Sequence, residues 1–206
     1  MTGRLRLSVL ASGRGSNLAA ILAAAAAPAF PAEVVLVVSD REGAEALNRA
    51  RQAMVPARFL DPKAHRDRDS YDASLLALLR ETEIGLVCLA GFMRILSAGF
   101  VRGFPGRILN VHPSLLPAFP GLAAQRQALE YGVKVTGATV HFVDEGVDTG
   151  PIVLQASVPV LPDDTEASLS ARILAEEHRL YPEAIRLFAT GRLRIDGRRT
   201  LVEALT

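Results

Sequence analysis

The stretch "GRILNVHPSLLPAFPG", residues 106 to 121, joins an apolar run to two polar residues and a proline-rich exit. Ile108, Leu109 and Val111 are typical of the end of a buried strand. Asn110 and His112 are two residues apart, so on a strand their side chains point to the same side. The prolines that follow exclude a helix and stiffen the chain. A polar pair at a rigid strand end suits a catalytic site, although an ordinary strand-to-loop transition shares this pattern.

Apolar strands alternate with helices on the N-terminal side of this stretch. Strand-like segments occupy residues 6–13, 33–40, 57–60, 84–91 and 107–112. Helical segments occupy residues 16–27, 43–53 and 68–82, and the first of them would be capped by Ser16 or Asn17. The strands are too apolar to face water, which favours a sheet covered on both sides. The predicted fold class is therefore α/β, a mainly parallel twisted sheet with helices on both faces, Rossmann-like.

The pattern changes after residue 135. Residues 136–144 and 151–160 predict an antiparallel strand pair joined by a glycine-containing loop. Residues 163–191 predict a long amphipathic helix, with Thr165 as its N-cap and a kink at Pro182, and a small hairpin follows. No linker-like segment interrupts the chain, so we expect a single domain over residues 1–206.

Composition excludes several classes of protein. The chain has 206 residues, is 50% hydrophobic and carries a formal net charge of +1, which does not favour binding to nucleic acid or to a membrane surface. A single cysteine, Cys88 in an apolar strand, excludes an internal disulfide framework and a cysteine-based zinc site. Without a signal peptide or an apolar membrane span, we expect a cytoplasmic protein.

The segment "SGRGSN", residues 12 to 17, joins the first strand to the first helix. Its glycines allow the backbone to approach a ligand, and the N–H groups at a helix start favour an anion. The segment is not a complete dinucleotide-binding motif, because Leu18 occupies the third glycine position. A phosphate site and a plain capped turn therefore remain two open interpretations.

Four histidines and one acidic loop complete the candidates. We expect His65 in a solvated loop, His178 partly buried on a helix and His141 hydrogen-bonded in the core, with no metal site. Asp148 lies in "DEGVDTGP", which predicts either an exposed acidic turn or a carboxylate that meets His112. In the second case an imidazole, its orienting carboxylate and the Asn110 amide suit acyl or formyl transfer by direct attack of an amine, with His112 kept charged by Asp148.

Five segments carry a family resemblance: "ASGRGSNL", "LAGFMRIL", "LNVHPSLLPAFPG", "TVHFVDEGVDTGPIVLQ" and "EEHRLYP". From about residue 6 to residue 190 the chain resembles the phosphoribosylglycinamide formyltransferases, folate-dependent enzymes of purine synthesis. The resemblance implies the formyltransferase fold, 10-formyltetrahydrofolate as co-substrate, no metal, and only small-molecule partners, in a monomer or homodimer. One departure is "PGLAAQRQ", where many relatives carry histidines at the positions of Ala123 and Gln125.

The resemblance also implies site residues. Asn110, His112 and Asp148 would be catalytic, and Asn110 and Asp148 would also contact the folate. Gly15, Ser16, Asn17 and Glu177 would bind the ribonucleotide. The remaining folate contacts would be Arg68, Met93, Arg94, Ile95, Leu96, Asp144, Glu145, Gly146 and Val147.

Other functions fit parts of the same pattern. A methionyl-tRNA formyltransferase would need a further C-terminal domain and a basic face, whereas this chain ends soon after its long helix. A formyltetrahydrofolate deformylase would need a preceding regulatory domain, whereas the first strand begins close to Met1. A non-catalytic nucleotide-binding module would use "SGRGSN" alone and would leave Asn110, His112 and Asp148 unexplained.

Overall fold

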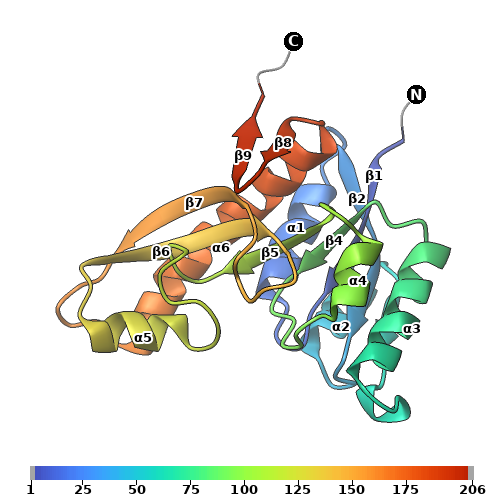
Figure 1. Ribbon diagram of the computed structural model, residues 1–206, viewed down its shortest axis with the longest axis horizontal. Coiled ribbons are helices and arrows are strands. Elements are labelled where there is room, and N and C mark those ends of the chain that lie inside the picture. Colours follow the sequence, from blue (N-terminus) through green and yellow to red (C-terminus); the bar gives the residue numbers. More distant parts are fainter. Residues whose placement is uncertain (1–2, 204–206) are drawn as a thin grey trace. The chain divides into compact units, whose positions relative to one another are not determined.

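The computed structural model describes residues 3–203, which fall into two compact units that meet in sequence between Leu109 and Asn110 (Figure 1). The single domain expected from the sequence stays a prediction. The strands of the first unit are mainly parallel, and the second unit contains the antiparallel pair. The predicted α/β class is therefore confirmed.

The first unit is an alternating series of strands and helices. Its strands are β1 (Leu5–Leu10), β2 (Ala32–Ser39), β3 (Ala57–Phe59) and β4 (Leu86–Leu89). Its helices are α1 (Ser16–Ala25), α2 (Glu45–Gln52), the 3-10 turn η1 (Pro62–Ala64), α3 (Arg68–Glu81) and α4 (Ala98–Gly103). The sequence prediction found all of these except η1 and α4.

The strand order in this unit is β3-β2-β1-β4, and the pairs are parallel. The chain adds β2 and β3 on one side of β1 and then adds β4 on the other side. The switch point of the sheet therefore lies between β1 and β4. Right-handed crossovers put α1 and α2 on one face and α3 on the other, with α3 packed beside α4 (Figure 1). The loops after β1 and β4 therefore leave the sheet side by side, where open α/β sheets bind their ligands.

The second unit has a different arrangement. It begins within β5 (Ile108–His112), whose first two residues belong to the first unit. Its other elements are α5 (Ala124–Tyr131), β6 (Val135–Phe142), β7 (Ile152–Pro159), α6 (Glu166–Ala189), β8 (Leu193–Asp196) and β9 (Arg199–Val202). Strands lie in the order β5-β6-β7-β9-β8, and α6 packs against β6 and β7 (Figure 1). The antiparallel pair β6–β7 and the terminal hairpin β8–β9 confirm the predictions, whereas α5 had not been predicted.

Helix ends agree only partly with the sequence prediction. The N-cap of α1 is Gly15, with φ 68° and no capping side chain, so the expected cap at Ser16 or Asn17 is wrong. Thr165 caps α6 as expected, and Ser168 completes a capping box there. The helix α6 continues through Pro182. None of the helices in residues 3–203 is long and apolar enough to cross a membrane.

The β6–β7 ladder contains one irregularity. Val140 pairs with Leu154, but the next residue, His141, pairs with Ile152, so Val153 is an extra residue on β7. Such a bulge bends one strand and redirects the side chains beside it. Here it lies at His141, immediately before the loop that carries Asp148.

Candidate active site

His112 and Asp148 meet in the second unit. The His112 Nδ1 atom lies 3.3 Å from Asp148 Oδ2, and the two side chains are only 5% and 12% exposed. His112 ends β5, whereas Asp148 lies in the loop between β6 and β7. The acidic loop is thus not a purely solvated turn, and the sequence hypothesis that Asp148 reaches His112 agrees with this geometry.

The amide of Asn110 joins the same cluster. Its Nδ2 atom lies 3.2 Å from His141 Nε2 and 3.4 Å from Asp148 Oδ1, so the NH₂ group faces two acceptors. His141 Nδ1 lies 2.8 Å from the Phe142 carbonyl oxygen and donates to it, which assigns Nε2 as the acceptor for Asn110. Asn110 and His112 therefore both turn toward Asp148, as their spacing on the strand predicted.

Asp148 is held ionised by its surroundings. Burial raises its pKa, but the contacts with His141, the Gly121 N–H and His112 outweigh burial and leave the pKa below its usual value. The Gly121 N–H donates to Asp148 Oδ2 at 2.8 Å. The backbone of Asp148 is left-handed, with φ 55°, a conformation that aspartate and asparagine tolerate better than most residues.

His112 lies between two acceptors. Its Nε2 atom lies 2.8 Å from the Phe119 carbonyl oxygen, and its Nδ1 atom faces Asp148. Burial lowers the pKa of His112; the Phe119 carbonyl and Asp148 raise it, without cancelling the effect of burial. Asp148 thus raises the pKa of His112, as expected, but burial is the larger effect and the net shift of this pKa is downward, opposite to the charged ring that was expected.

Both ring nitrogens of His112 face acceptors, so a proton on either nitrogen has a hydrogen-bond partner in place. With Nε2–H donating to Phe119, a proton arriving at Nδ1 would complete a charge-assisted hydrogen bond to Asp148. This is the behaviour of a general base whose conjugate acid is stabilised in place. The Asn110 amide adds a neutral donor beside the pair.

The loop between β6 and β7 is organised from within. Asp144 Oδ1 accepts from the Gly146 N–H at 3.1 Å and from the Thr149 hydroxyl at 2.6 Å. A side chain on Gly146 would collide with Thr149, because its Cβ atom would lie 2.1 Å from Oγ1. Glu145 and Val147 remain exposed. Asp144 thus shapes the loop that presents Asp148, besides the folate contact that the resemblance implied.

The "SGRGSN" segment follows β1 in the first unit. The Gly13 carbonyl accepts from the Ala46 N–H at 3.0 Å, and the Arg14 carbonyl accepts from Arg49 Nε at 2.8 Å. Both carbonyls are therefore held by α2, and no side chain caps α1. A Cβ atom on Gly15 would lie 2.9 Å from the Cα and Cβ atoms of Ala46. This position therefore needs glycine for close packing as well as for its positive φ.

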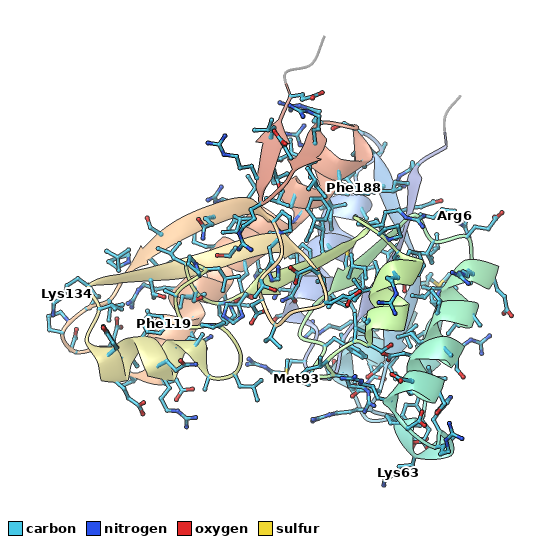
Figure 2. The ribbon with its side chains drawn as sticks, viewed as in Figure 1. Arg6, Lys63, Met93, Phe119, Lys134 and Phe188 are labelled. Carbon is cyan, nitrogen blue, oxygen red and sulfur yellow. The ribbon has the colours of Figure 1, made fainter. Side chains whose placement is uncertain are left out.

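The segment Met93–Leu96 follows β4 and is tied to the same region. The Ser12 hydroxyl accepts from the Met93 N–H at 2.8 Å, and the Ser12 N–H donates to the Gly91 carbonyl at 3.0 Å. Met93 and Ile95 are exposed, at 56% and 60%; Figure 2 labels Met93. The two predicted binding segments of this unit therefore lie beside each other.

Other predicted residues have more local surroundings. The guanidinium of Arg94 stacks on Tyr71, 4.5 Å from the ring centroid, so this side chain fixes the segment. Arg68 begins α3 and is exposed. Glu177 lies on α6 and is 7% exposed. Ala123, with φ 57°, precedes α5, and Gln125 lies in that helix.

The other histidines agree in part with the sequence prediction. His178 is partly buried, which lowers its pKa, and His141 lies in the core as expected. His65 is not simply solvated, because its ring packs edge-on against Tyr71, with the centroids 5.3 Å apart. No group of three or more histidine, cysteine, aspartate or glutamate side chains that could hold a metal ion occurs in residues 3–203.

His141 is the contact that the sequence prediction missed. It was assigned to the core, where it lies with 2% exposure, but its Nε2 atom also reaches Asn110 and lies 3.6 Å from Asp148 Oδ1. The sequence signal for a functional role of His141 was a polar residue within an apolar, buried strand. Without the pairing of β5 and β6, that signal could not be connected to Asn110.

Comparisons with known proteins identify the family of this chain. The model of the formyl transferase family matches residues 5–185. The chain is 45% identical over 191 residues to phosphoribosylglycinamide formyltransferase of Escherichia coli K12, covering 93% of this chain and 90% of that protein. It is 52% identical over 190 residues to the trifunctional purine biosynthetic protein adenosine-3 of Drosophila melanogaster, covering 91% of this chain but only 14% of that protein.

A solved structure is also closely similar. The crystal structure of glycinamide ribonucleotide transformylase 1 from Symbiobacterium toebii superimposes with a TM-score of 0.96 at 57% identity, covering 98% of this chain and 95% of that chain. The similarity therefore extends over both compact units. The chain belongs to the formyl transferase family.

Proposed function

We propose that this protein transfers a formyl group from 10-formyltetrahydrofolate to the amine of 5′-phosphoribosylglycinamide, a step of purine biosynthesis. The observation that carries the proposal is the buried cluster of Asn110, His112 and Asp148. The names of relatives that match over most of their length, a phosphoribosylglycinamide formyltransferase and a glycinamide ribonucleotide transformylase, support the acceptor and the formyl transfer. A cytoplasmic location, a monomer or homodimer, and the absence of nucleic-acid partners stay predictions.

In the proposed reaction the substrate amine attacks the formyl carbon directly. A new C–N bond forms, the bond from the formyl carbon to the folate nitrogen breaks, and one proton moves from the amine to that nitrogen. His112, with Asp148 beside its Nδ1 atom, would assist this proton transfer from the amine to the leaving nitrogen. The Asn110 amide can turn its weaker donor, now 3.4 Å from Asp148, toward the formyl oxygen as charge develops there.

The two segments of the first unit are proposed to bind different ends of the substrates. Gly15, Ser16 and Asn17 would hold the ribonucleotide phosphate, because backbone N–H groups at the start of α1 favour a dianion. Glu177 would face the amine end. The folate contacts that the resemblance implies are Arg68 and Met93–Leu96 in the first unit and, in the second unit, the loop Asp144–Asp148.

One experiment separates the candidate functions. The purified protein is given 10-formyltetrahydrofolate with phosphoribosylglycinamide, with charged initiator tRNA, or with no acceptor. We expect formyl transfer only to phosphoribosylglycinamide. Transfer to tRNA, formate release without an acceptor, or phosphate binding without any transfer would instead identify a methionyl-tRNA formyltransferase, a deformylase or a non-catalytic binding module.

Ser16→Ala is expected to raise the apparent KM for the ribonucleotide about 10-fold, because a hydrogen bond to a charged group is lost. The KM for the folate should change less than about 2-fold. Steady-state kinetics with each substrate varied in turn measure both values. Ser74→Ala is the matched control, since its hydroxyl donates only to the Ser70 carbonyl within α3. Equal increases for both substrates would contradict the assignment of this loop to phosphate.

A chelator is expected to leave the transfer rate unchanged. The proposed proton transfer and charge stabilisation use an imidazole, a carboxylate and an amide, and no step requires a Lewis acid. Activity is measured after dialysis against EDTA and again after addition of Mg²⁺ or Zn²⁺. Loss of activity that a divalent ion restores would contradict this mechanism.

A further inference from the structure

The proline loop, residues 113–121, rests on one face of β6. Gly137, Thr139 and His141 are every second residue of the strand, so their positions lie on this same face. Gly137 is needed where the loop lies closest, because a Cβ atom there would lie 2.9 Å from Leu115 Cδ2 and 1.9 Å from the Ala156 carbonyl oxygen. Four residues further on, His141 contacts Asn110. Thr139 lies between these two positions.

The hydroxyl of Thr139 has all its hydrogen-bonding capacity in use. It donates to the Ser114 carbonyl at 2.7 Å, and it accepts from the Leu116 N–H at 3.1 Å and from Gln155 Nε2 at 3.0 Å. Thr139 is fully buried. One hydroxyl provides one donor and two acceptor lone pairs, so this group fixes two points of the loop backbone and has no capacity left.

Gln155 holds both Thr139 and the backbone of the proline loop. It pairs directly with Thr139 across the β6–β7 ladder, and its Nε2 atom also donates to the Leu116 carbonyl at 2.9 Å. The N–H and the C=O of Leu116 are therefore held by neighbouring side chains of two strands. The Ser114 hydroxyl donates to the Ala118 carbonyl at 2.5 Å and closes the next turn of the loop.

The far end of the same loop contacts the candidate catalytic pair. The Phe119 carbonyl accepts from His112 Nε2, and the Gly121 N–H donates to Asp148 Oδ2, both at 2.8 Å. Phe119 has φ 52°, which is strained for a bulky side chain and needs support from its surroundings. Its ring packs edge-on against Tyr131 of α5, with the centroids 6.0 Å apart; Figure 2 labels Phe119 beside this helix.

We propose that Gln155 is a positioning residue for His112 and Asp148, acting through Thr139 and the proline loop. Its amide anchors the first half of the loop, so that the second half presents one acceptor to the imidazole and one donor to the carboxylate. The proposal rests on the proposed function in taking His112 and Asp148 as the catalytic pair. Gln155 itself contacts neither side chain through any hydrogen bond described for residues 3–203.

Gln155→Met tests the proposal, because it keeps the length of the side chain and removes both donors. We expect kcat to fall about 10- to 100-fold, as for a small displacement of catalytic groups, with each KM within about 3-fold of its original value. Thr139→Val should repeat the effect, whereas Thr139→Ser keeps the hydroxyl and should restore most of the rate. An unchanged kcat in Gln155→Met, or a Thr139→Ser variant as slow as Thr139→Val, would overturn the proposal.

A second readout does not depend on activity. The titration of the His112 ring is followed by NMR in the ligand-free protein. Asp148 and His141 are the titratable side chains that act on this ring, and neither is changed in Gln155→Met. Withdrawal of the Phe119 carbonyl should lower the His112 pKa further. The matched control is Val158→Ala, a buried β7 position, which should reduce stability without moving that titration.

These readouts separate the two proposals. A shifted His112 titration in Gln155→Met, in a protein that transfers no formyl group to the ribonucleotide, would support the positioning role and reject the proposed function. An unmoved titration, or an equal shift in Val158→Ala, would reject the positioning role even in an active formyltransferase.

Discussion

Replacing His112 with asparagine is expected to lower kcat by roughly 10²- to 10⁴-fold, the usual contribution of a general acid/base. Asparagine keeps a hydrogen-bonding side chain at the end of β5 but cannot take up a proton. The ribonucleotide KM should change little, because the phosphate contacts are proposed to lie after β1. Single-turnover kinetics with saturating substrates measure the chemical step.

The control for this variant is His65→Asn. His65 is also partly buried and hydrogen-bonded, through Nδ1 to the Asp61 carbonyl oxygen, but it has no proposed role. The His65 variant should keep its rate. A His112→Asn protein that is folded and retains more than about a tenth of the original kcat would rule out proton transfer by this ring.

Asp148→Asn is expected to lower kcat by at least roughly 10²-fold. Asparagine tolerates the left-handed backbone at φ 55°, so the change removes the charge with little added strain. Asp148 raises the pKa of His112, which burial already holds below its usual value. Without that charge the pKa should fall further, and a proton on Nδ1 would no longer be stabilised. The expected sign is therefore a His112 titration displaced to lower pH.

Two further measurements complete this test. The double variant His112→Asn with Asp148→Asn should be much less impaired than the product of the two single losses, since the two residues act as a unit. Asp163→Asn, an exposed carboxylate in the turn before α6, is the charge-matched control and should be nearly silent. Multiplicative losses in the double variant would show that the two side chains act independently.

The sequence was most informative where one pattern decides the structure. Apolar strands such as residues 84–91 are buried on both faces, which only a covered parallel sheet satisfies, and β4 confirms it. The spacing of Asn110 and His112 similarly requires a shared side. The contact between His112 and Asp148 could only be a hypothesis based on their chemistry, because no local sequence pattern links residues 36 positions apart.

The failures have physical causes as well. Helix α4 has six residues, two of them glycine, and α5 starts after a left-handed Ala123, so neither shows a sequence signal of helical length. The cap of α1 was misplaced because Gly15 is selected by its φ and by contact with Ala46, not by a side-chain hydrogen bond. The direction of the net pKa shift of His112 could not be predicted, because burial is a property of the fold.

The proposed role of Gln155 could not be predicted from the sequence. Its partner Thr139 is recognised only through the register of β6 and β7, and that register contains a bulge. Sequence patterns predict which strands exist far better than which residues face each other across them.

The bulge at Val153 makes the site depend on how many residues the chain has at that point. Deleting Val153 would leave Val140 paired with Leu154 and His141 with Ile152, but it would remove the local bend of β7 and change the direction in which the acidic loop leaves the strand. The carboxylate of Asp148 would then miss the imidazole although every catalytic side chain is still present. Anyone who transplants this site into another sheet must therefore conserve the residue count between His141 and Leu154, besides the residues themselves.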